Sequence, residues 1–412
     1  MADGLNNFFI SAAFNIVENI PHVGGPPESG VLNDIPLFSL TDSPVTLTEI
    51  SETIKLLKDK KTLDSSGISV HFIKLFSDQL LSPLQHIINL SLSTSSVPSQ
   101  LKIAKVIPLF KQGDASSMDN YRPISLLSSF SKILEKVVCN RLCSFLDTNN
   151  LLSAYQFGFR TGHSTIHPML HFSNHISKAL NNKEHTIAIF CDLRKAFDSC
   201  DHKILLSKMY KLGIRGATLD WFANYLSNRN QYVTVNGQDS SLKTVKIGVP
   251  QGSILGPILF LIYINDLPNF TLLLSLLFAD DTTLLASGKN LAELVTFVNN
   301  ELHKISTYFR MNRLALHPLK TQFLVISNSH AVLNSNINLF INNNNPEAGN
   351  DPSLIYPIAR ISSLSPVPAV KFLGVYFDPA MNFKFHINSI STKISRALFM
   401  LRRCKNFLST NS

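Results

Sequence analysis

Apolar side chains recur at helical spacing through the first part of the chain. Within residues 46–57, Ile50, Ile54 and Leu57 fall on one face, and Thr46 stands ahead of them as a candidate cap. This pattern predicts an amphipathic helix. Similar patterns predict helices over residues 72–81, 83–92, 128–146, 166–180 and 291–309.

Strand patterns follow in the middle of the chain. Residues 102–110 alternate between apolar and polar positions, and residues 186–190 form an almost wholly apolar run that is typical of a buried strand. Further strands are predicted at residues 232–235, 242–249, 272–278, 282–286, 322–327 and 370–376. Asn236-Gly237 separates the first two of these strands and Asp280-Asp281 the next two, which predicts two hairpins.

The ends of the chain and one internal stretch have weaker patterns. Residues 1–45 contain a short amphipathic stretch at 8–17 and a Gly- and Pro-rich cluster at 22–27, which indicates an extension or linker. An Asn-rich stretch at about residues 330–368 predicts a mobile insertion. Strands interleaved with helices, between helical ends, predict an α+β core with helical domains attached.

Composition and charge restrict the class of partner. The chain has 412 residues, of which 45% are hydrophobic and 16% charged, so it is not intrinsically disordered. Lys+Arg minus Asp+Glu is 37 − 28 = +9, which favours an anionic partner. A membrane is not expected, because the apolar stretch 254–264 is too short to span one and is interrupted by Gly256 and Pro257. The N-terminus carries no secretory signal, so we expect an intracellular protein.

Cysteine and histidine patterns argue against stabilisation by disulfides or zinc. The five cysteines include no CxxC pair, and the thirteen histidines show no zinc-binding spacing. A reducing compartment fits this usage best.

Three aspartates stand where a metal would explain them. Asp192 follows the buried-strand pattern, and Asp280 and Asp281 lie between two apolar strands. An Asp-Asp pair at a turn is most often simply solvated. Here the apolar flanks predict partial desolvation, and two like charges ~4 Å apart then cost about 4 kcal/mol. A divalent cation would offset this cost, and oxygen ligands select Mg²⁺ or Mn²⁺. Two such metals serve in-line phosphoryl transfer.

Several short motifs in a fixed order resemble the reverse transcriptase of non-LTR (LINE-like) retrotransposons. The resemblance runs over about residues 46–406. Its motifs are residues 105–111, 120–127, Gln156-Phe157-Gly158-Phe159-Arg160 with 162–165, 192–198, 249–257, 278–281, 316–321 and 372–374. Each motif alone is weak evidence, whereas the ordered set is specific.

The resemblance implies a right-hand polymerase with fingers, a ferredoxin-like palm with an antiparallel sheet, and a partial helical thumb. Residues 46–185 would be mainly fingers. Residues 186–380 would be the palm, with a fingers insertion at about 203–247, and residues 381–412 a truncated thumb. The implied reaction extends a DNA 3′-hydroxyl with dNTPs on an RNA template.

The same resemblance assigns the catalytic groups. Asp192, Asp280 and Asp281 would bind the catalytic Mg²⁺, with Mn²⁺ as an alternative. Lys320 would be the general acid for pyrophosphate, although a surface lysine at a strand entry is the more common case.

The implied nucleotide-binding residues are Lys111, Arg122, Phe197, Gln251 and Gly252. Lys111 and Arg122 would clamp the triphosphate. The Phe197 ring would leave no room for a 2′-hydroxyl. Gln251 and Gly252 would support the template and the incoming base, since glycine permits close backbone approach. Without the motifs, these residues would read as a solvated face, a core aromatic and an ordinary turn.

Three departures from the family pattern are evident. Within residues 61–69, Asp64 stands where glycine is common and Ser66 where aspartate is common, which puts the template-guiding role of this segment in question. Pro168 is compatible with a helix only in the first turn. Tyr308 replaces a frequent tryptophan.

Two alternatives stay open at this level. One is a catalytically silent, nucleic-acid-binding remnant of such an element, and the other is an RNA-dependent RNA polymerase with the same palm. We expect the family's endonuclease domain to be absent from this chain, which would then be the polymerase core of a larger element. A nuclear location follows if copying takes place on chromatin.

Overall fold

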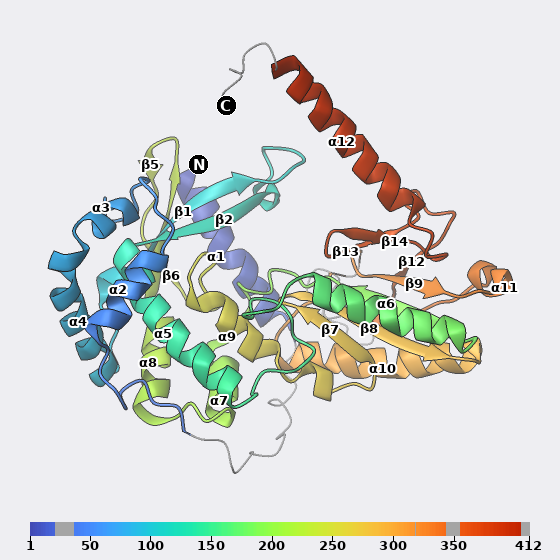
Figure 1. Ribbon diagram of the computed structural model, residues 1–412, viewed down its shortest axis with the longest axis horizontal. Coiled ribbons are helices and arrows are strands. Elements are labelled where there is room, and N and C mark those ends of the chain that lie inside the picture. Colours follow the sequence, from blue (N-terminus) through green and yellow to red (C-terminus); the bar gives the residue numbers. More distant parts are fainter. Residues whose placement is uncertain (21–36, 318, 343–354, 405–412) are drawn as a thin grey trace.

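The computed structural model describes residues 1–20, 37–317, 319–342 and 355–404. Its main sheet lies at the centre of the part that carries the three aspartates (Figure 1). This sheet has five strands in the order β12-β9-β3-β8-β7. They are β3 (His185–Cys191), β7 (Leu274–Phe278), β8 (Asp281–Gly288), β9 (Gln322–Ile326) and β12 (Ala359–Ile361). An antiparallel sheet was predicted, and that prediction is wrong at one edge, because β12 pairs with β9 in parallel while the other pairs are antiparallel.

Helices cover both faces of this sheet. Ile187 and Ile189 of β3 belong to the large core cluster that includes the apolar face of α10 (Leu291–Met311). The intervening Ala188 belongs to a second cluster with Phe172 of α6 (Ile166–Asn181). The strand therefore reads as a continuous apolar run because both of its faces are covered (Figure 1).

A second sheet is built from two distant parts of the chain. Its strands are β1 (Ile103–Phe110), β2 (Tyr121–Leu127), β4 (Arg229–Val235), β5 (Gln238–Asp239) and β6 (Lys243–Val245). β1 pairs with β2 antiparallel and with β4 in parallel. Asn236 and Gly237 both have positive φ, 51° and 78°, which confirms the predicted hairpin.

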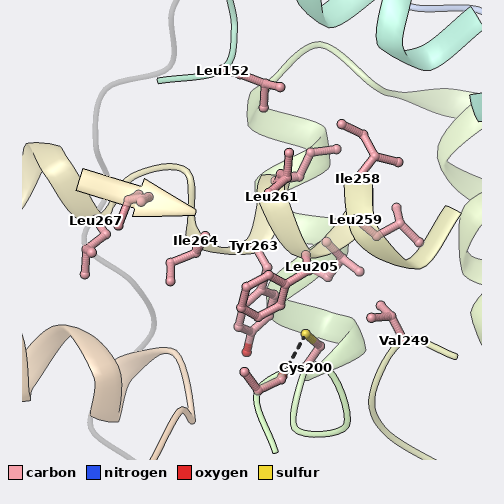
Figure 2. Packing of buried hydrophobic residues seen from close by; sticks show 14 of the residues in the cluster. Leu152, Cys200, Leu205, Val249, Ile258, Leu259, Leu261, Tyr263, Ile264 and Leu267 are labelled. Atoms are coloured by element: carbon pink, nitrogen blue, oxygen red, sulfur yellow. Dashed lines mark hydrogen bonds between the residues drawn. The ribbon is translucent and has the colours of Figure 1, made fainter. Parts of the chain in front are cut away.

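Helices pack around these sheets, with α9 buried among them. The helices of this part are α2 (Leu47–Leu56), α3 (Val70–Leu75), α4 (Ser77–Ser93), α5 (Ser129–Thr148), α7 (His202–Lys211), α8 (Gly216–Leu226) and α9 (Leu255–Ile264), with short 3₁₀ turns at Ser99–Lys102, Met118–Asn120 and Leu267–Asn269. Nearly every residue of α9 is buried, and Figure 2 shows Leu259, Leu261 and Tyr263 packed near Leu205. An apolar helix without a polar face must be enclosed in this way.

Several predicted helix boundaries are confirmed and one is wrong. The Thr46 side chain accepts a hydrogen bond from the Glu49 backbone N–H and caps α2. Pro168 lies in the first turn of α6, where its missing N–H costs nothing. The helices predicted at 72–81 and 83–92 are divided differently, because the break falls at Phe76 and Pro83 lies inside α4.

The N-terminal residues do not form a free linker, so that part of the prediction is wrong. Ala2–Glu18 form helix α1, which is longer than the stretch predicted at residues 8–17. Leu5 and Phe9 of α1 are buried against Val106 of β1 and Val233 of β4. The apolar face of the helix therefore completes the core under the second sheet. The predicted breaker cluster at 22–27 lies outside the described residues.

Two predictions near the C-terminal side also need correction. Residues 370–376 form a hairpin, β13 (Val370–Phe372) and β14 (Val375–Phe377), and not one strand, because Leu373 and Gly374 have φ values of 46° and 100°. The Asn-rich stretch is partly ordered, since it supplies β10 (Phe340–Asn342), β11 (Ile355–Pro357) and β12. Residues 343–354 lie outside the described part.

The last helices differ in how they pack. α11 (His330–Asn334) is a short helix near β9. α12 (Lys384–Cys404) has no buried residue and projects away from the sheets (Figure 1).

Candidate active site

The Asp280-Asp281 pair lies at the tip of a two-residue hairpin. Phe278 pairs with Asp281, so Ala279 and Asp280 form the turn between β7 and β8. Ala279 adopts a φ of 58°, which allows the strands to reverse direction. Asp280 is therefore a turn residue, whereas Asp281 begins a strand.

Asp192 is brought beside this hairpin by the pairing of β3 with β8. Cys191, the last residue of β3, pairs with Thr282, so Asp192, which directly follows the strand, extends toward Asp281. The backbone of Asp192 is fixed on its other side, where its carbonyl accepts a 2.8 Å hydrogen bond from the His317 N–H. The main sheet thus places the predicted aspartates at one end of adjacent strands.

Burial and neighbouring negative charge raise the pKa values of both members of the Asp280-Asp281 pair. Burial, with the nearby charges of Asp280 and Asp192, raises the pKa of Asp281 to about 6, even though its side chain keeps solvent access. Burial and Asp192 also raise the pKa of Asp280, while Arg122 opposes that rise. An oxygen-only donor set whose charged form is disfavoured fits a divalent cation.

A closed metal site is not already formed by these side chains. Among the described residues, no three acidic, histidine or cysteine side chains stand in an arrangement that could hold a metal. Carboxylates of like charge repel one another, so we expect the three to close only around a cation. The metal role of Asp192, Asp280 and Asp281 stays a prediction.

The hairpin that carries Asp280 and Asp281 is held by hydrogen bonds from residues 155–158. The Gln156 side-chain oxygen accepts hydrogen bonds from the backbone N–H groups of Gly158, at 2.9 Å, and Ala279, at 3.1 Å. A Cβ on Gly158 would lie 2.4 Å from the Ala279 nitrogen. Sequence reasoning did not single out these two residues, although they belong to the motif Gln156-Phe157-Gly158-Phe159-Arg160.

Phe197 lies beside the same region. Its ring stacks on Phe260 of α9, with ring centroids 4.5 Å apart, and meets Phe159 edge-on at 6.4 Å. Its carbonyl accepts a 2.8 Å hydrogen bond from the Val249 N–H. The ring is partly buried, so one part of it serves the core and another is left accessible.

The loop before α9 packs directly on β2. The Ser125 N–H donates to the Gln251 carbonyl at 3.2 Å. Gly252 has a φ of 100°, and a Cβ there would lie 2.6 Å from the Ser125 carbonyl oxygen. Glycine is therefore required at position 252 for packing against β2, whereas its predicted approach to the template and the incoming base stays a prediction. The Gln251 side-chain amide donates to both carboxylate oxygens of Asp198 at 2.8 Å.

The basic side chains predicted for the site lie on other elements than the carboxylates. Arg122 lies near the tip of the β1–β2 hairpin, and Lys111 just beyond β1 pairs through its N–H with the Asn120 carbonyl at 2.8 Å. Partial burial, Arg122 and Lys320 together lower the pKa of Lys111. The Lys320 Nζ is 4.0 Å from Asp192 Oδ2, and its side chain is 65% exposed. Positive charges therefore surround the edge that carries the aspartates.

Comparison with known proteins gives the family. Residues 110–377, more than half of the chain, match the model of the family described as reverse transcriptase (RNA-dependent DNA polymerase). The chain belongs to this family. The matched region of the reverse transcriptase family begins at the end of β1 and ends with β14, and it contains all nine residues predicted for the site. The resemblance stated from the motifs is confirmed.

Curated relatives of this reverse transcriptase family member come from non-LTR elements. The chain is 29% identical over 396 residues to the probable RNA-directed DNA polymerase from transposon BS of Drosophila melanogaster, covering 90% of this chain and 40% of that protein. It is 29% identical over 377 residues to the polymerase from mobile element jockey of the same species, covering 88% and 39%. To the Pol polyprotein from element R2 of Popillia japonica it is 24% identical over 262 residues, covering 60% and 35%. The chain thus spans about 40% of the length of the first two relatives.

Two further properties of this reverse transcriptase family member bear on the sequence expectations. Within the described residues, no helix combines the length and apolarity needed to cross a bilayer. The five cysteines are free thiols, and the closest pair, Cys139 and Cys143, has its sulfurs 3.8 Å apart.

Proposed function

We propose that this chain is the polymerase core of a non-LTR retrotransposon and that it extends a DNA 3′-hydroxyl with dNTPs on an RNA template. The observation that carries the proposal is the register of β3 against β8, which sets Asp192 beside the Asp280-Asp281 turn. Family membership supports the reaction class. An RNA template, a DNA primer and dNTPs are the partners.

The aspartates would hold Mg²⁺, or Mn²⁺ in its place. The chemistry supplied there would be activation of the 3′-hydroxyl as a nucleophile and neutralisation of charge on the leaving pyrophosphate. The raised pKa values of Asp280 and Asp281 support this assignment, because a cation would stabilise the charged carboxylates that burial, and then the neighbouring negative charges, disfavour. Lys320, whose Nζ lies 4.0 Å from Asp192 Oδ2, protonates the pyrophosphate as a general acid.

The other residues bind and select the nucleotide. Lys111, just beyond β1, and Arg122 of β2 grip the triphosphate. Phe197, fixed by its stack on Phe260, closes the space that a 2′-hydroxyl would need. Gln251 and Gly252, held against β2, support the template and the incoming base.

We assign the domains of a right-hand polymerase accordingly. Residues 46–185 are mainly fingers, 186–380 are the palm, and 381–412 begin the thumb. The segment 203–247 returns to the fingers, which is supported by the pairing of its strand β4 with β1. We place the protein inside the cell, with access to chromatin for its DNA primer.

Primer extension with purified protein on a poly(rA)/oligo(dT) duplex tests the proposal. We expect Mg²⁺-dependent dTTP incorporation by the parent and loss of more than about 1,000-fold in Asp280→Asn, because removing a metal-binding charge abolishes two-metal chemistry. Asp220→Asn, an exposed aspartate on α8, is the matched control and should retain activity. Absence of incorporation by the parent would favour a silent, nucleic-acid-binding remnant.

The choice between DNA and RNA precursors is tested at Phe197. The parent should strongly prefer dNTP over rNTP, and Phe197→Ala should relax that preference by opening space at the sugar. Competition between dTTP and UTP measures it. Equal use of both nucleotides by the parent would point to an RNA-dependent RNA polymerase.

A further inference from the structure

The Asp198–Gln251 pair joins the segment after β3 to the loop before α9. One amide nitrogen, Nε2 of Gln251, lies 2.8 Å from Oδ1 and 2.8 Å from Oδ2 of Asp198. An ionised carboxylate only accepts hydrogen bonds, so the amide must turn its NH₂ group toward Asp198. The carboxamide oxygen of Gln251 is thereby directed to the other side.

Asp198 is itself rigidly placed. Its N–H donates to the Lys195 carbonyl at 2.9 Å, in a turn where Lys195 has a φ of 45°. Gly248 packs against its backbone so closely that a Cβ there would lie 2.5 Å from the Asp198 carbonyl oxygen. The Gly248 carbonyl in turn accepts a 2.8 Å hydrogen bond from His202 Nε2. The carboxylate therefore has little freedom to follow Gln251 if the amide moves.

The charge of Asp198 is matched by its surroundings. Burial raises its pKa to about 6, while Gln251, Lys195, Lys111 and Arg122 oppose that rise. At neutral pH the group is therefore ionised. Two of these cations, Lys111 and Arg122, are the ones proposed to bind the triphosphate, so Asp198 lies close to the nucleotide without being a metal ligand.

We infer that Asp198 is a positioning residue, which fixes the Gln251 carboxamide so that its oxygen is presented to the incoming nucleotide as a hydrogen-bond acceptor. The group recognised is a hydrogen-bond donor on the nucleotide. This inference rests on the proposed role of Gln251 in nucleotide binding. It gives the second aspartate of the Asp192–Asp198 segment a task separate from that of the first.

The test is a double-mutant cycle on nucleotide binding. The full chain is mixed with Mg²⁺ and an RNA–DNA duplex whose primer ends in a dideoxynucleotide, and the dTTP concentration for half-maximal thermal stabilisation is measured. Asp198→Asn and Gln251→Ala should each raise it about 10-fold, the effect of losing one charge-assisted hydrogen bond. The double variant should be no worse than Gln251→Ala, because Asp198 acts only through that amide.

Exchanging the carboxylate and the carboxamide between the two positions gives an independent check that does not depend on how well Asp198→Asn folds. Gln251→Glu places two carboxylates face to face and should weaken dTTP binding. Adding Asp198→Asn to it should restore part of the binding, since the asparagine amide can donate to the glutamate. Asp198→Asn thus harms the parent and helps the Gln251→Glu variant.

Specific outcomes would overturn the inference. One is a double variant whose dTTP concentration for half-maximal stabilisation rises about 100-fold, because independent sites have effects that multiply. Another is a lower melting temperature for Asp198→Asn with unchanged dTTP dependence, because a structural role alone would produce it. A parent whose stability does not respond to dTTP also contradicts it. Because the blocked primer needs no turnover, a parent that binds dTTP but fails to incorporate it would defeat the proposed function and leave this inference standing.

Discussion

The aspartate end of the main sheet and the tip of the β1–β2 hairpin hold their charged residues in opposite ways. Asp192, Asp280 and Asp281 lie at the ends of strands that are buried on both faces, and the Gln156 side chain supports the hairpin that carries the last two. Lys111 and Arg122 stand on a hairpin end that is largely exposed, and Lys111 is fixed through a backbone hydrogen bond to Asn120.

The difference follows from the chemistry that each region is proposed to perform. Metal ligands must keep their geometry against mutual repulsion, so they need a rigid base. Cations that bind a triphosphate can approach from an exposed, solvated element, because Lys and Arg have long side chains. The two regions should therefore respond differently to mutation.

The largest expected effect comes from disturbing the rigid base. Gly158→Ala places a Cβ 2.4 Å from the Ala279 nitrogen and must shift the Asp280 turn. Because a displacement of about 1 Å costs about 100-fold in rate, primer extension should fall by at least that much. Gly288→Ala, at the far end of β8 from Asp281, is the control, since its Cβ would meet Leu294 of α10 at an ordinary 3.7 Å. Full activity in Gly158→Ala would show that the hairpin is not held rigidly.

Stability should separate the two regions next. Gln156→Ala leaves the N–H groups of Gly158 and Ala279 without their acceptor, which should lower the free energy of unfolding by about 2 kcal/mol. Lys111→Ala, on the exposed tip, should change it by less than about 0.5 kcal/mol. Urea unfolding followed by circular dichroism measures both. Equal losses would remove the distinction between a rigid base and a solvated tip.

Metal binding at the aspartates should depend on pH. The pKa of Asp281 is raised to about 6, and its protonated form cannot bind a cation. Affinity is therefore fully present above that pKa and is lost as the pH falls through it. The Mg²⁺ concentration for half-maximal stabilisation of the free protein should be about 10-fold higher at pH 5 than at pH 8. Asp281→Asn should weaken this dependence and leave the part that comes from Asp280, whose pKa is also raised. A flat response in the parent would contradict the prediction.

The smallest effect is expected at the exposed cations. Arg122→Ala and Lys111→Ala should each raise the KM for dTTP about 5-fold, because solvent weakens each contact to phosphate. Arg122→Lys should fall between, since it keeps the charge and loses the two-pronged grip. Lys105→Ala, a lysine within β1, is the control and should leave KM unchanged. Loss of kcat without a change in KM would place these cations in catalysis and not in binding.

Local features of the site were readable in the sequence, and partners across the fold were not. The apolar run of β3, the turn at Asn236-Gly237 and the close approach at Gly252 follow from residue types at fixed spacing. Gln156 and Asp198 were missed as supporting residues, because their partners Ala279 and Gln251 lie 123 and 53 positions away. Nothing in the local pattern of either residue names such a partner.

The amino-acid sequence by itself determined the family, the order of the motifs and the identity of the three aspartates, because local period and residue type carry that information. Only the tertiary structure decided that α1 completes the core under the second sheet, that β12 joins β9 in parallel, and that residues 370–376 turn back on themselves. Strand partners and helix docking depend on which apolar surfaces can be buried together over the whole chain. That balance is a property of the fold and is not written in any one segment.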